Sequence, residues 1–166
     1  MSSNDNLTAN AYILAAGSLN SAKIVSSAWV LETGMSVLDW QAQCLKEIQG
    51  NVELTIAVGC DVHKFAGNNV GHNFSYVSDW ENGTALQSFL SVIHGFDHTA
   101  IVMYGDTVFH AHTIKSFASI DADVVVGVDS NWRQRFGSRP FDDMRDAETI
   151  ELADGAEVEY TGLLKL

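Results

Sequence analysis

The sequence is poor in proline, cysteine and basic residues. Its 166 residues include one proline, two cysteines and nine Lys or Arg against 21 Asp or Glu, which gives a formal net charge of −12. Because so acidic a protein repels phosphate backbones and anionic membranes, the composition argues against nucleic acid or a membrane surface as its partner. An acidic protein can still bind a nucleotide when Mg²⁺ lies between its carboxylates and the phosphates.

Long apolar runs are also missing. No run approaches the ~20 residues of a membrane-spanning helix, and the polar start MSSNDNLTAN lacks the features of a signal peptide. Cys44 and Cys60 lie in apolar surroundings without the spacing of a metal site, as expected of reduced, buried thiols. Together these features predict a cytoplasmic protein.

What is present is the composition of a globular domain. Hydrophobic residues make up 46% of the chain and charged residues 18%, which is typical of a packed core with a soluble surface. We expect residues 1–10 to form a flexible tail and residues 11–166 to form one domain. The sequence leaves open whether the chain forms a homo-oligomer.

Short apolar runs alternate with helical patterns along the chain. The runs predict five strands, at residues 11–17, 52–59, 73–78, 100–104 and 123–129, of which the third lies nearer an edge. Apolar spacing predicts helices over residues 37–49, from Asn82-Gly83-Thr84 to the glycine at 95, and over 110–119. This rhythm indicates βαβ units, and therefore a three-layer α/β sandwich with a mixed, mostly parallel sheet and helices on both faces.

The helices carry signals of their own. Ser36 and Asp39 form a capping-box-like start to the first helix, and Gly50 supplies its end. Apolar residues at helical spacing predict the buried faces of the other two helices: Leu86, Phe89, Leu90 and Ile93 in the second, and Ile114, Phe117 and Ala118 in the third.

The rhythm breaks after residue 130. A polar segment there contains four arginines, Arg133, Arg135, Arg139 and Arg145, beside several acidic residues. Such a cluster can bind a phosphate or form ion pairs within the segment, and internal pairing is the commoner outcome. Residues 149–166 then predict a hairpin around Asp154-Gly155, and residues 61–66 a short helix or turn.

The most informative position is Asp106. The apolar run at 100–104 stops abruptly at Gly105-Asp106. Because ligands of open α/β sheets bind outside the carboxyl ends of the strands, Asp106 is placed to face a site, and Gly105 allows a tight turn before it. An aspartate at this point can equally cap the next turn or helix, and the residues alone do not separate the two interpretations. Asp129, at the end of the run 123–129, is a weaker candidate of the same kind.

Five segments in order carry a resemblance to a known family: ILAAG (13–17), GMSVLDWQAQCLK (34–46), DWENGTALQSFLS (79–91), IVMYGDTVF (101–109) and EYTGLLKL (159–166). The chain resembles the nucleotidyltransferases of Rossmann-like, glycosyltransferase-A-like fold, especially the cytidylyltransferase-like domains that activate phosphocholine or phosphonates. The resemblance implies transfer of CMP from CTP, with Mg²⁺, to a phosphorylated or phosphonylated small molecule or sugar phosphate, releasing pyrophosphate.

The resemblance also implies roles for particular residues. The nucleotide would be bound by Ala15, Ala16, Gly17, Ser18, Gly83 and Thr84, with the last two at the base or ribose. Asp106 would hold Mg²⁺ and act in catalysis, and Trp80 could line the pocket. Glu159, Thr161 and Gly162 would lie near the acceptor.

The phosphate loop departs from the family pattern. After LAAG the family has a second glycine and an arginine, and then a Pro-Lys pair, whereas this chain has SLNS and no Pro-Lys. Lys23 is the nearby cation that could neutralise the phosphates and act in catalysis, although a solvated lysine is the commoner explanation. The second metal-binding carboxylate of the family follows the point where this sequence stops, so we expect the domain to lack the C-terminal part of the family fold. A non-catalytic nucleotide-binding or protein-interaction module is therefore the alternative.

Overall fold

A four-stranded parallel sheet forms the centre of the molecule. The structure, a computed structural model, describes residues 7–17, 26–48, 50–61, 72–93, 95, 97–129, 131–137 and 164–165. The sheet contains β1 (Leu7–Ala15), β2 (Gly50–Val58), β3 (Asn73–Tyr76) and β4 (Thr99–Tyr104) in the order β3-β2-β1-β4. All neighbouring strands in it are parallel, and β3 lies at an edge, as predicted. A separate antiparallel pair joins β5 (Thr107–Val108) to β6 (Leu164–Lys165).

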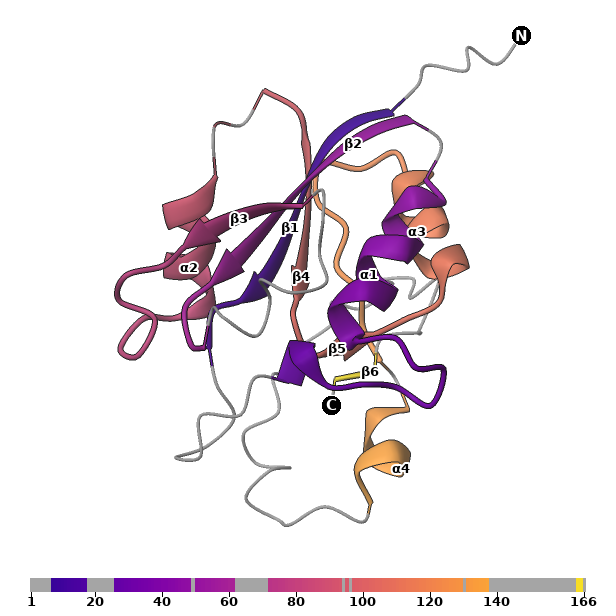
Figure 1. Cartoon of the computed structure of the whole chain (residues 1–166). Helices are drawn as coiled ribbons and strands as arrows, with labels where there is room; N and C mark the ends of the chain where they lie inside the picture. Colours follow the sequence, from indigo (N-terminus) through magenta and orange to yellow (C-terminus); the bar gives the residue numbers. More distant parts are fainter. Residues whose placement is uncertain are drawn as a thin grey trace, which may run out of the picture.

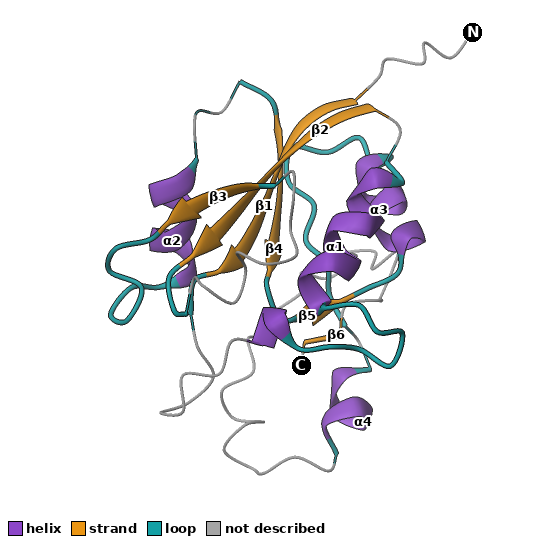
Figure 2. Ribbon diagram, in the orientation of Figure 1, coloured by secondary structure: helices purple, strands orange, loops and turns teal. Residues whose placement is uncertain are grey.

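Helices cover both faces of this sheet. The α-helices are α1 (Val37–Lys46), α2 (Ala85–Val92), α3 (Ala111–Ala118) and α4 (Trp132–Phe136), and η1 (Ser26–Ala28) is a single 3₁₀ turn. Figures 1 and 2 show α1 and α3 together on one face and α2 on the other. The predicted three-layer α/β architecture is therefore confirmed. Within the described residues, no helix is both long and apolar enough to cross a membrane.

The alternation of side chains along β1 divides the core in two. Ala11, Ile13 and Ala15 pack with residues of α1 and α3 on one face. Tyr12 and Ala16 pack on the other face, where the ring of Tyr12 meets that of Phe89 edge to face at 5.3 Å between centroids. Because helices cover both faces, the central strand is apolar at consecutive positions, which is the pattern of a buried parallel strand.

Strand β1 begins earlier than the sequence indicates. It starts at Leu7, so residues 7–10 belong to the sheet and the prediction of a tail reaching residue 10 is wrong for them. Ala9 is buried and lies between Val52 and Thr99 in the two neighbouring strands. Because polar residues stand on either side of Ala9, a prediction based on apolar runs does not detect that Ala9 is buried.

Helix α1 starts as predicted and ends early. The Ser36 hydroxyl accepts a hydrogen bond of 3.0 Å from the backbone N–H of Asp39, which makes Ser36 the N-cap. The helix ends at Lys46, before the predicted end at residue 49, and Gly50 begins β2 at a φ of +144° instead of ending the helix. The connection from α1 to β2 therefore spans residues 47–49 and is one residue longer than expected.

The predicted buried stripe of α2 is wrong at two positions. Leu86 is 63% exposed and Leu90 54% exposed, whereas Ser88 and Val92 are buried. Leu86 and Leu90 are one helical turn apart and share the side that faces away from the sheet. Only the packing of α2 on the sheet decides between the two apolar sides of this helix. In α3, Ile114 is buried as predicted, but Ala118 is exposed and Thr113 takes the second buried position.

The predicted fifth strand does not form. Residues 123–129, which the structure describes, have no strand assignment, and Val124 and Val126 are 78% and 65% exposed. The prediction rested on β-branched composition, but a strand also needs a neighbour for its backbone hydrogen bonds. Among the described residues, no fifth strand therefore lies beside the neighbouring ends of β1 and β4. The predicted turn after Asp61 and the hairpin around Asp154-Gly155 lie outside the described residues.

Candidate functional site

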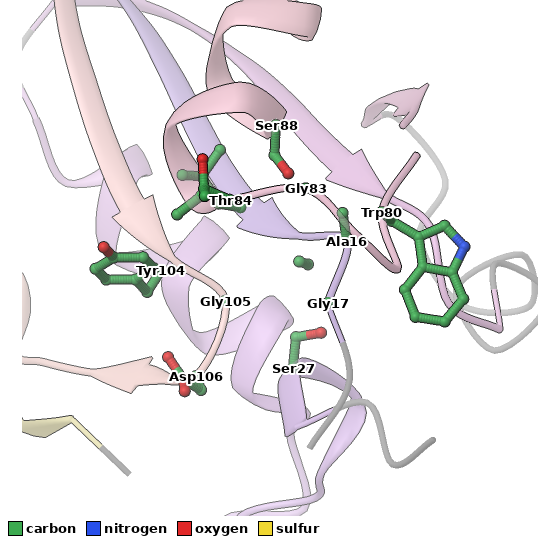
Figure 3. Close-up of a pocket in the computed structure, with 13 residues that line it drawn as sticks. Ala16, Gly17, Ser27, Trp80, Gly83, Thr84, Ser88, Tyr104, Gly105 and Asp106 are labelled. Carbon is green, nitrogen blue, oxygen red and sulfur yellow. The ribbon is translucent and has the colours of Figure 1, made fainter. Parts of the chain in front are cut away.

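A cavity of about 210 Å³ opens at the carboxyl ends of β1 and β4. Its walls come from residues 14–17 at the end of β1, residues 83–85 with Ser88 at the start of α2, and residues 104–106 after β4, together with Ser27 and Trp80 (Figure 3). Five residues predicted to bind a nucleotide, Ala15, Ala16, Gly17, Gly83 and Thr84, thus share one pocket with Asp106. The sheet brings together segments that lie far apart in the sequence.

Asp106 occupies a turn that is pressed against β1. The N–H of Gly105 donates to the carbonyl of Leu14 at 2.9 Å. A Cβ on Gly105 would lie 2.9 Å from the Cβ of Ala15 and 3.0 Å from the Leu14 oxygen, so only glycine fits there without a shift. The N-cap of α3 is His110, which shows that Asp106 does not cap the helix that follows it.

Helix α1 holds this turn from the opposite side. The Gln41 side-chain amide donates to the carbonyls of Tyr104 at 2.8 Å and Thr107 at 2.7 Å, which flank Gly105 and Asp106. The Trp40 indole N–H donates to the carbonyl of Phe109 at 2.7 Å. Gln41 was not identified from the sequence. It occupies a core position of α1, between Leu38 and the apolar residues near the end of the helix, and a polar residue at a core position is the signal that could have identified it.

The wall formed by α2 begins with a capping box. The Thr84 hydroxyl accepts from the N–H of Gln87 at 3.2 Å, and the Gln87 side-chain oxygen accepts from the N–H of Thr84 at 2.7 Å. The N–H of Gly83 donates to the carbonyl of Asp79 at 2.9 Å. Because these N–H groups are already engaged, a ligand at this wall would meet the Thr84 hydroxyl and the first amides of the helix, which lack intrahelical partners.

Trp80 borders the pocket, as the sequence suggested, and lies directly on the backbone after β2. A Cβ on Gly59 would come within 2.4 Å of Cγ of Trp80. The indole is partly buried between both core clusters and shows one face at the side of the cavity (Figure 3). Gly59 therefore makes room for an aromatic wall.

Asp106 alone among the lining residues that the structure describes has a charged side chain. In the described part of the chain, no group of three or more His, Cys, Asp and Glu side chains is placed to hold a metal ion. Mg²⁺, however, is commonly bound by one or two carboxylates together with water and substrate phosphates. A single carboxylate in this pocket fits Mg²⁺ that arrives with a nucleotide, and does not form a metal site of its own.

Several predicted residues are not among the described residues that line the pocket. Ser18, Lys23, Glu159, Thr161 and Gly162 lie outside the described residues, and so do Arg139 and Arg145. Asp129 does not line the pocket. It accepts from Nε of Arg135 at 2.9 Å, and this hydrogen bond holds the pKa of the Asp129 carboxyl below its usual range. The guanidinium of Arg133 lies 5.3 Å from the ring centroid of Trp132. Arg135 thus pairs with Asp129, which precedes the arginine-containing segment. The expected pairing with the acidic residues Asp142, Asp143, Asp146 and Glu148 lies outside the described residues.

The parallel sheet with helices on both faces is an α/β fold that this chain shares with a solved nucleotidyltransferase. That protein is the inositol-1-phosphate CTP transferase from T. maritima, which is 17% identical to this chain and superimposes with a TM-score of 0.52. The match covers 74% of this chain and 55% of the transferase, so the chain corresponds to little more than half of its length. No protein-family model and no curated protein matches the sequence. At this identity the likeness establishes the fold.

Proposed function

We propose that the protein is a nucleotidyltransferase that transfers CMP from CTP to a phosphorylated or phosphonylated small molecule or a sugar phosphate. The observation that carries this proposal is the pocket that joins Gly17, Thr84 and Asp106 at one end of the parallel sheet. One solved structure with this fold is a CTP transferase for inositol 1-phosphate, which supports the same class of reaction.

In this reaction an oxygen of the acceptor phosphate or phosphonate attacks the α-phosphorus of CTP. The bond from that phosphorus to the bridging oxygen breaks, and pyrophosphate leaves with the electron pair. The protein needs no covalent intermediate, so its task is to align the two substrates and to stabilise negative charge. Residues 15–17 would shape the nucleotide pocket, and Gly83, Thr84 and Trp80 would border the base or ribose.

Asp106 would hold Mg²⁺ against the phosphates, where the ion neutralises part of their charge. Its turn is held between β1 and α1 by the hydrogen bonds of Gly105 and Gln41. This support fixes the backbone of the turn that carries the carboxylate. Lys23 as a second charge, and an acceptor site with Glu159, Thr161 and Gly162, remain part of the proposal.

A second candidate is a nucleotide-binding module without catalysis. The observation that favours it is that no Lys, Arg or His side chain lines the described part of the pocket. Such a module would bind CTP with Mg²⁺ without consuming it. Turnover, and not binding, therefore separates the two functions.

The test is pyrophosphate release from CTP with inositol 1-phosphate, phosphocholine or 2-aminoethylphosphonate as acceptor. We expect turnover with one of these acceptors, and Asp106→Asn should reduce kcat roughly 100-fold or more, as for the loss of one electrostatic contact to a transition state. Gln43→Ala, at an exposed position of α1, is the matched control and should keep full activity. CTP binding without turnover would favour the non-catalytic module. Absence of nucleotide binding would refute both.

A further inference from the structure

Ser27 in η1 carries a buried hydroxyl without a partner. Its side chain is 1% exposed, and its Oγ has no hydrogen-bond partner among the described residues. Burying an unpaired hydroxyl costs folding free energy, and native structures contain few such groups. The position therefore calls for an explanation beyond packing.

The unpaired hydroxyl borders the candidate site. Ser27 is one of the residues that line the cavity, and Figure 3 shows its oxygen directed to the side where Gly17 lies. A ligand oxygen in the cavity would supply the partner that the described residues do not provide. The hydroxyl is then unsatisfied in the free protein and paired in the complex.

Its location within the pocket indicates which part of a ligand it meets. In the view of Figure 3, Ser27 and Asp106 border the lower part of the cavity, whereas Thr84 and Ser88 border the upper part at the start of α2. If Asp106 holds Mg²⁺ on the phosphates, the phosphate chain must occupy the lower part. Ser27 then faces anionic oxygens and not the base.

The charges of the pocket support the same assignment. No cationic side chain lines its described part, so in that part phosphate oxygens would be held by neutral donors and by the metal ion. A hydroxyl that donates to an anionic oxygen makes a charge-assisted hydrogen bond, which is stronger than a neutral one. We propose that Ser27 Oγ donates a hydrogen bond to a phosphate oxygen of the bound nucleoside triphosphate, an inference that rests on the proposed function.

The fold holds Ser27 ready for this contact. The carbonyl of Trp29, next to η1, accepts from the N–H of Val37 at 2.9 Å, and Val30 pairs with Ser36 in an isolated bridge. Ala28 packs against the core cluster beneath α1. Because the residues that follow η1 are tied to the start of α1, the hydroxyl can be presented without ordering by the ligand.

The experiment compares the full chain with Ser27→Ala and, as a matched control, Ser116→Ala, whose hydroxyl donates to the His112 carbonyl in α3. Thermal unfolding of the free proteins and calorimetric titration with CTP and with cytidine, all with Mg²⁺, are the readouts. We expect free Ser27→Ala to unfold at the same temperature as the parent chain or higher, because the substitution removes no internal hydrogen bond. Its affinity for CTP should fall about tenfold or more, as for a lost bond to a charged group, while cytidine binds unchanged. Ser116→Ala should leave both affinities unchanged.

Three results would overturn the inference. A melting temperature of Ser27→Ala below that of Ser116→Ala would mean that the hydroxyl has a structural partner. Equal weakening of CTP and cytidine would move the contact to the nucleoside, and unchanged CTP affinity would remove it. Failure of the proposed function is seen separately, because the unsubstituted chain would then bind no CTP or turn none over.

Discussion

The side-chain amide of Gln41 in α1 donates a 2.8 Å hydrogen bond to the backbone carbonyl of Tyr104, the last residue of β4 and 63 positions further along the chain. The same amide donates to the carbonyl of Thr107. Gln41 is fully buried, so its two hydrogen bonds are shielded from water. The turn that carries Asp106 is thereby fixed by a residue from another layer of the fold.

Replacing Gln41 by leucine should therefore destabilise the protein. The substitution leaves two carbonyls without their donor, and we expect the free energy of unfolding to fall by about 2–3 kcal/mol. Chemical denaturation at neutral pH measures this change. Gln43→Leu on the exposed side of the same helix should change it by less than about 0.5 kcal/mol. Equal losses in the two variants would show that the hydrogen bonds of Gln41 do not stabilise the turn.

Gly105→Ala tests the contact between the same turn and β1. The new Cβ would lie about 3 Å from Ala15 and from the Leu14 backbone, which cannot yield as a flexible side chain would. We expect a loss of about 1–3 kcal/mol in unfolding free energy, together with weaker binding of CTP and Mg²⁺ as Asp106 is displaced. Gly137→Ala, whose added Cβ would have its nearest neighbour at 3.5 Å, is the control and should be tolerated. A Gly105→Ala variant as stable as this control would contradict the close approach.

Thr84→Ala tests the capping box at the start of α2. Loss of the hydroxyl removes the acceptor for the N–H of Gln87, and we expect a cost of about 1 kcal/mol in thermal or chemical unfolding. Thr84→Ser keeps the acceptor and should recover most of that loss. Since Thr84 also lines the pocket, the alanine variant should bind CTP more weakly than the serine variant. If serine fails to restore stability, the methyl group and not the hydroxyl is the important part.

The pair of Asp129 and Arg135 should make stability depend on pH in a defined direction. The hydrogen bond from Arg135, with a second from the N–H of Asn131, holds the pKa of the Asp129 carboxyl below its usual range. A carboxyl with a lowered pKa in the folded state stabilises the protein above the unfolded pKa of about 3.9 and loses this effect as the pH falls through the folded pKa. Asp129→Asn should therefore be less stable than the parent chain at neutral pH.

This difference should shrink when unfolding is measured at successively lower pH, and it should vanish once Asp129 is protonated in both states. Added salt should also reduce it, because the guanidinium of Arg135 is partly exposed. A difference that persists unchanged into strong acid would show that the effect of the substitution is not electrostatic.

The sequence by itself determined the features that depend on neighbouring residues. The Ser36 cap, the glycine-aspartate turn after β4 and the apolar central strands follow from local hydrogen bonding and from side-chain periodicity. Parallel strands all point their carboxyl ends to one edge, so the sequence alone predicts that Gly17 and Asp106 share a pocket.

Tertiary structure alone decided which surfaces meet. The exposure of Leu86 and of Val124, and the burial of Ser27 at the pocket, depend on contacts between segments far apart in the chain. An apolar stripe or run indicates that a segment can be buried. Which neighbour buries it depends on the shape and hydrogen bonding of the whole folded chain. Gln41 is the clearest case, because its role depends on carbonyls that only folding brings within hydrogen-bonding distance.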